Sequence, residues 1–204
     1  SILHNEMCNN IYIRCNPNVS CDVRLENSHF NGLTIGLVIT EPAQVLIVNT
    51  IINGKNRDTC RRVTVIDLYE PNSEILIKGS TFRNLYYPSS IHSTTADNTS
   101  NLLSIQDSLF EDNQNGLQIL GTVNSEFYNC TFLNNGHTYV KDGGSGVHFA
   151  RGVFNNFAIF RRCLFKYNHA SAGGALTTAA IHNRIEGMLP VGCSETLALN
   201  VLVD

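Results

Sequence analysis

Three polar residues in the second half of the chain could take part in acid–base chemistry or ligate a metal ion. Asp112 follows Glu111, Asp142 lies in the Gly-rich stretch 141–144, and His148 comes four residues later. Carboxylates and imidazoles act as general acids and bases, and clustered carboxylates bind Ca²⁺. The ordinary interpretation is that Asp-Gly-Gly forms a turn and that His148 is an outward strand residue. We favour this interpretation, so Asp112, Asp142 and His148 are weak catalytic candidates.

Composition and spacing exclude several other kinds of site. The remaining histidines occur at no metal-ligand spacing, so the sequence predicts no metal and no cofactor. The net charge of −3 leaves no basic footprint for a nucleic-acid backbone. No apolar run approaches the length of a membrane span. We therefore expect neither a nucleic acid nor a membrane span.

Asparagine sequons and cysteines favour an oxidising, secretory environment. Three Asn-x-Ser/Thr sequons start at Asn18, Asn98 and Asn129, and the chain has seven cysteines. Asn98 is the best glycosylation candidate because it lies in a long polar interruption, 86–101, whereas Asn129 is a predicted turn residue. The sequence thus predicts an extracellular or cell-surface protein. A reduced cytosolic protein with chance sequons remains the alternative.

The chain consists of near-copies of one pattern around an apolar anchor residue. The residue two before each anchor is small, and the residue five before is large and apolar. The residue three before is Asn, Asp or Gly in every copy except one, and these types tolerate a left-handed turn. The anchors are Phe30, Ile52, Phe82, Phe110, Phe132 and Phe165; the turn residues are Asn27, Asn49, Gly79, Asp107, Asn129 and, as the exception, Arg162; the large apolar residues are Leu25, Ile47, Ile77, Ile105, Phe127 and Phe160.

This spacing predicts strands that stack. The residues seven and five before each anchor, apolar in every copy except for Ser125, are two apart, as on one face of a strand. The small residue and the anchor then form a second short strand, and a third strand follows a loop. Like positions carry like residues, which a parallel β-helix requires and a sandwich does not; a Leu-rich-repeat horseshoe lacks its consensus here. We predict an all-β, right-handed single-stranded parallel β-helix, a solenoid of about six to seven coils.

The repeat also predicts the domain organisation. Residues 23–204 should form the parallel β-helix, and residues 1–22 an irregular Cys-rich N-terminal cap or lead-in. Cys8, Cys15 and Cys21 lack the paired spacing of a zinc site, so we interpret them as a staple for this end. The final alternating stretch, 197–203, is typical of the opening strand of another coil. We therefore expect the solenoid to continue beyond the C-terminus or to be capped by a partner.

The most complete copy resembles a known family. It contains Cys163-Leu-Phe165-Lys-Tyr-Asn168 followed by Gly173-Gly174-Ala175-Leu176. It resembles the repeat of the chlamydial polymorphic outer-membrane proteins, which combines F-x-x-N with G-G-A-[I/L/V]. The F-x-x-N half recurs at 110–113 and 132–135, whereas the first three coils fit only the general pectin-lyase-like pattern. The resemblance implies a right-handed β-helix and a surface adhesin, within a fold that also hosts polysaccharide lyases and hydrolases.

Cys130 and Cys163 occupy the same small inward position on successive coils. One coil spacing falls within the Cα separation of a disulfide, but parallel side chains favour a buried thiol ladder. We expect the thiol ladder and keep the disulfide as the alternative.

One outward face is apolar where a solenoid should be polar. Leu46, Val48 and Leu76 lie at the predicted outward positions six and four before the anchors. Such a patch marks contact with another segment or chain. The sequence therefore predicts a non-enzymatic extracellular or surface scaffold, similar to an adhesin, that contacts other protein segments or subunits and, as a further partner class, carbohydrate. The alternative is a polysaccharide-active enzyme, a lyase or glycoside hydrolase.

Overall fold

A computed structural model gives the fold. It describes residues 2–5, 10–15, 21–32, 34–54, 63–69, 72–85, 87–93, 101–121, 123–136, 146–149, 158–169, 176–178 and 189–191. Within these ranges every regular element is a β-strand, which confirms the all-β prediction. No helix in the described part of the chain has the length and apolarity needed to cross a membrane.

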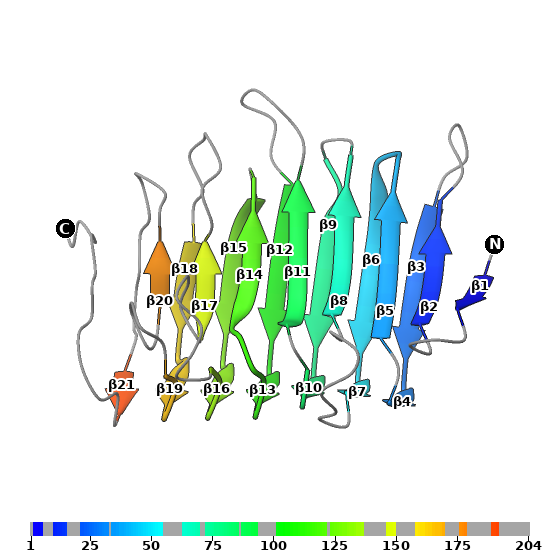
Figure 1. Ribbon diagram of the computed structural model, residues 1–204. Coiled ribbons are helices and arrows are strands. Elements are labelled where there is room, and N and C mark those ends of the chain that lie inside the picture. The colour runs from blue at the N-terminus through cyan, green and yellow to red at the C-terminus, as the bar shows by residue number, and fades with distance from the viewer. Residues whose placement is uncertain are drawn as a thin grey trace.

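The strands form three sheets that the chain visits in a fixed rotation (Figure 1). The eight-stranded sheet contains β1 (Ile2–Asn5), β2 (Asn10–Arg14), β5 (Thr34–Ile39), β8 (Val63–Leu68), β11 (Tyr87–Ser93), β14 (Leu117–Leu120), β17 (Val147–Phe149) and β20 (Leu176–Thr178). The six-stranded sheet contains β3 (Cys21–Glu26), β6 (Ala43–Val48), β9 (Glu74–Lys78), β12 (Asn101–Gln106), β15 (Val123–Tyr128) and β18 (Ala158–Arg161). The seven-stranded sheet contains β4 (His29–Asn31), β7 (Ile51–Asn53), β10 (Thr81–Arg83), β13 (Leu109–Glu111), β16 (Thr131–Leu133), β19 (Leu164–Lys166) and β21 (Leu189–Val191). One passage through the three sheets is called a coil below.

Like residues stack on like residues, as the repeat predicts. All six anchors align in successive parallel pairs from Phe30 to Phe165, and the large apolar row aligns from Leu25 to Phe160. The Phe82, Phe110 and Phe132 rings stack with centroids 5.0 Å apart, and Phe132 stacks on Phe165 at 4.6 Å. These rings are fully buried. The core is therefore a set of aromatic and aliphatic rows that run through the coils.

The turn before each anchor is left-handed, which confirms the role predicted for Asn, Asp and Gly at that position. The φ angles range from 48° at Asn49 to 58° at Gly79, and Arg162 adopts 55° although its side chain disfavours that region. Gly79 also has a steric reason to be glycine, because a Cβ at this position would lie only 2.6 Å from Asn49 Oδ1. The stacking of the coils therefore imposes the turn even where the residue type opposes it.

Buried asparagines join the last coils through a second row of hydrogen bonds. The F-x-x-N motif places Asn113, Asn135 and Asn168 at equivalent, fully buried positions. Asn113 Nδ2 donates to Asn135 Oδ1 at 2.8 Å, and Asn135 Nδ2 donates to Asn168 Oδ1 at 3.0 Å. Each amide also donates to the backbone oxygen of an anchor in the preceding coil, for example Asn135 Nδ2 to Phe110 O at 2.8 Å. The asparagine side chains thus satisfy backbone groups that the turn leaves without a ladder partner.

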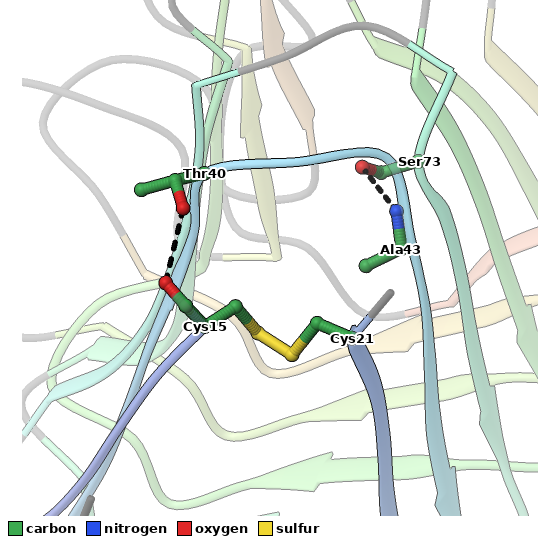
Figure 2. Close-up of a disulfide and its surroundings, with 5 residues drawn as sticks. All are labelled: Cys15, Cys21, Thr40, Ala43 and Ser73. Atoms are coloured by element: carbon green, nitrogen blue, oxygen red, sulfur yellow. Dashed lines mark hydrogen bonds between the residues drawn. A yellow bond between two sulfur atoms is a disulfide. The ribbon is translucent and has the colours of Figure 1, made fainter. Parts of the chain in front are cut away.

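The N-terminal residues 1–22, expected to be an irregular lead-in, contain two strands. β2 pairs in parallel with β5, and β1 folds back antiparallel on β2, so the strands extend the eight-stranded sheet at this end (Figure 1). A disulfide joins Cys15, at the end of β2, to Cys21, at the start of β3 (Figure 2). Thr40 Oγ1 donates to Cys15 O at 3.0 Å and ties this corner to the next coil. Cys8 lies outside the described residues.

Candidate contact surface on the six-stranded sheet

The predicted acid–base residues lie on different elements. Asp112 is an exposed turn residue after β13, and its Oδ1 accepts a hydrogen bond from Asn134 Nδ2 at 2.6 Å. His148 is half-buried at the centre of β17, in another sheet. Asp142 lies outside the described residues. Within the described part, no group of three His, Cys, Asp or Glu side chains is arranged to hold a metal ion.

The two inward cysteines replace the hydroxyl residues of earlier coils. Ser80 Oγ donates to the backbone oxygens of Lys78 at 3.0 Å and Ile47 at 3.3 Å. Cys130 Sγ makes the equivalent contacts, to Tyr128 O and Ile105 O, at 3.3 Å each. Cys130 and Cys163 are both free and buried.

The electrostatics of the Cys130 thiol fit a packing role. A hydrogen bond with the Cys163 thiol and burial together raise the pKa of Cys130 far above its usual value. The same hydrogen bond lowers the pKa of Cys163. Both thiols are buried, so packing accounts for the pair better than nucleophilic catalysis, which needs an accessible thiolate.

Of the three sequon asparagines, only Asn129 lies among the described residues. Asn129 is exposed, and its Nδ2, the atom to which a glycan would be attached, donates to Asp107 Oδ1 at 2.8 Å in an outer row. Asn18 and Asn98 lie outside the described residues, so glycosylation stays a prediction.

The apolar outward patch lies on the outer face of the six-stranded sheet. Strand alternation sends every second side chain of β6, β9 and β12 into the core and leaves the others outside. Leu46 and Leu76 are in register on this outer face and half-buried, and Leu102 on β12 is 48% exposed. Val48 is also half-buried in the next row, beside Lys78. The structure therefore brings together the leucines that the sequence singled out.

A groove with a volume of about 720 Å³ follows this face across the strands. Its lining residues come from β3, β6, β9, β12 and β15, so it spans successive coils. Leu46, Leu76 and Leu102 come from three neighbouring strands, and charged and amide side chains lie beside them, with Glu74 in register with Leu102. The lining residues are Arg24, Gln44, Val45, Leu46, Glu74, Ile75, Leu76, Leu102, Leu103, Ser104, Gln106, Asn124, Ser125 and Glu126.

One row of this groove was not predicted from the sequence. The predicted outward positions lie six and four before each anchor, whereas Gln44, Glu74, Leu102 and Asn124 stand eight before. Extending the period of two by one more step would have found Leu102. Between the two rows the groove is also lined by the buried residues Val45, Ile75, Leu103 and Ser125.

Comparisons of the chain with protein-family models, curated proteins and solved structures found no match.

Proposed function

We propose that the chain is a right-handed parallel β-helix of the pectin-lyase-like kind, with its repeats closest to those of the polymorphic outer-membrane proteins. Two observations support this proposal. From β2 to β19 the described strands visit the three sheets in the same order, and each pairs in parallel with its equivalent in the next coil. Parallel crossover connections are right-handed in about 98% of cases, which supports the proposed hand.

The proposed function is that of a non-enzymatic, adhesin-like scaffold that contacts other protein segments or subunits through the leucine groove. The observation that carries it is the position of Leu46, Leu76 and Leu102, three aliphatic side chains on neighbouring strands of an outer sheet face, with charged and amide side chains beside them in the same groove. An apolar centre with a polar rim is the usual anatomy of a protein contact surface. Neighbouring coils supply the centre jointly, so the scaffold itself creates the surface.

The proposed setting is extracellular or the cell surface. The disulfide between Cys15 and Cys21 supports it, because such bonds persist mainly in oxidising compartments. A polysaccharide-active enzyme is not proposed, since no observation on the described residues favours it.

Sedimentation velocity with groove variants tests the contact function. The wild-type chain is expected to associate as its concentration rises through the micromolar range, and Leu46→Thr/Leu76→Thr should weaken that association. Thr is chosen because it suits an outward strand position. Leu109→Thr is the matched control: Leu109 lies half-buried on the seven-stranded sheet, between Thr81 and Thr131 in register. A wild-type chain that remains monomeric, or equal weakening by the control, would overturn the groove as the contact surface.

A further inference from the structure

The last described full coil breaks the turn pattern of the others at both of its corners. Ten described non-glycine residues have a positive φ, and eight of them are Asn or Asp. The other two are Arg162, at 55°, and Tyr167, at 56°, which flank β19 on either side. Long and aromatic side chains adopt this region only at a cost in strain. Strain of this kind concentrates at functional sites, where the side chain is needed for another purpose.

Both unusual residues take part in exposed cation–aromatic pairs. Arg162 Nη1 donates to Tyr128 Oη at 2.9 Å, and its guanidinium lies 5.6 Å from the centre of that ring. Lys166 Nζ lies 4.7 Å from the centre of the Tyr167 ring. Tyr128 is 41% exposed and Tyr167 is 49% exposed. The two turns therefore place a cation against Tyr128, at the end of β15 in the preceding coil, and present Tyr167 with Lys166 against its ring.

The segment that contains β18 and β19 is positively charged, whereas the rest of the chain is negatively charged. Residues 143–185 contain no Asp or Glu and five of the 14 Lys and Arg residues, although the whole chain has a net charge of −3. Arg161 and Arg162 are both exposed, and Arg161 stands in register with Tyr128. The structure thus gathers positive charge and exposed tyrosines around β18 and β19.

We propose that Tyr128, Arg161, Arg162, Lys166 and Tyr167 form a binding surface, the basic–tyrosine corner, for an acidic segment of another protein. Tyr and Arg are among the residue types enriched at the energetic centres of protein contacts. The guanidinium groups pair with carboxylates through planar hydrogen bonds. The inference goes beyond the proposed function, because the corner shares no residue with the leucine groove.

Carboxylates on the two preceding coils favour a short acidic protein segment over a uniform polyanion as the partner. The two preceding coils carry Asp107, Glu111, Asp112 and Glu126. Duplex nucleic acid carries one negative charge per about 1.7 Å along its axis, so any length beyond this coil would meet those carboxylates. A protein segment can place a few acidic residues on the corner and neutral residues elsewhere.

The strained turns provide a variant that separates binding from folding. Arg162→Asn/Tyr167→Asn restores the residue type of the earlier turns, where Asn129 Nδ2 donates to Asp107 and Asn134 Nδ2 donates to Asp112. The double variant should therefore be at least as thermally stable as the wild type. Asparagine at these two positions should relieve the backbone strain and at the same time remove the side chains of the proposed surface.

Fluorescence anisotropy with a labelled oligo-glutamate peptide tests the proposal. The wild-type chain should bind this probe in low salt, and the double variant should bind it about tenfold more weakly or worse. Arg14→Asn, which removes an exposed cation on β2 at the other end of the solenoid, is the charge control and should bind like the wild type. Salt at about 0.5 M should abolish binding by the wild type, since surface charges are then screened.

Several results would overturn the inference. The basic–tyrosine corner is wrong if the wild type does not bind the peptide, or if the double variant and Arg14→Asn bind equally. A lower melting temperature of the double variant would refute the strain argument. Tighter binding of a heparin oligosaccharide or of single-stranded DNA than of the peptide would show that the partner class is wrong.

Discussion

Replacing Asn135 by Ala should be among the most damaging single changes in the chain, because this amide joins three coils. Asn135 is fully buried. Its Nδ2 donates to Phe110 O at 2.8 Å and to Asn168 Oδ1 at 3.0 Å. Its Oδ1 accepts from Asn113 N at 3.2 Å and from Asn113 Nδ2 at 2.8 Å. Alanine would remove all four hydrogen bonds, because its side chain has no donor or acceptor to replace the amide.

The magnitude follows from the groups left without partners. Asn113 N and Phe110 O lose these bonds in a buried environment, whereas Asn113 Nδ2 keeps a second acceptor in Phe82 O at 3.0 Å. Each buried polar group left unpaired costs about 1–3 kcal/mol. Two such groups give an expected loss of about 3 kcal/mol in the free energy of unfolding, measured by urea titration.

The neighbouring residue provides the control. Asn134 is exposed, adopts a φ of 51° and donates a single side-chain bond to Asp112 Oδ1. Asn134→Gly keeps the left-handed turn and removes only that exposed bond, so it should cost about 0.5 kcal/mol. A loss below about 1 kcal/mol for Asn135→Ala, or equal losses for both variants, would refute the reasoning that the inner row holds the coils together.

Three further changes test other features of the core. Phe110→Ala should cost about 3–5 kcal/mol in a denaturant titration, because it leaves a cavity between stacked rings; a loss below about 1 kcal/mol would contradict its place in the core. The pKa of Cys130 is raised in the folded state, so this thiol favours the native state below its ordinary value of about 8.5 and ceases to do so as the pH rises. Unfolding titrations should thus show the free energy of unfolding of the wild type falling relative to that of Cys130→Ser as the pH rises above that value, and parallel pH profiles would count against this prediction. Cys15→Ser/Cys21→Ser should lower the free energy of unfolding by about 2 kcal/mol, from the chain entropy of a short loop, and a calorimetric melt identical to that of the wild type would show that the disulfide adds nothing.

The rows of the core were predictable because they depend on residue spacings that can be read directly from the sequence. A strand alternates its side chains with a period of two, and the left-handed turn restricts the residue before each small position. These two rules placed Phe110 and Ile105 inside and Leu46 and Leu76 outside, and the structure has them there. The burial of Cys130 and Cys163 followed from the same small position in the repeat.

Contacts between coils were predictable only in part. The F-x-x-N motif marked Asn113 and Asn135, but their role depends on which backbone oxygen lies opposite in the preceding coil. The loops between coils differ in length, so the sequence separation of two residues does not determine which of them lie opposite each other in neighbouring coils. The same limit hid the pairing of Cys15 with Cys21, for which Cys8 was an equal candidate by sequence.

The sequence by itself determined the repeat, the inward rows and the residue types at the turns, because each depends on backbone preferences within a few residues. Only the tertiary structure decided which residues of different coils meet. It placed Tyr128 beneath Arg162, separated Asp112 from His148 on different sheets, and forced Arg162 into a turn that its side chain disfavours. The physical reason is that stacking energy is summed over whole coils, so one unfavourable residue follows the register set by all the others.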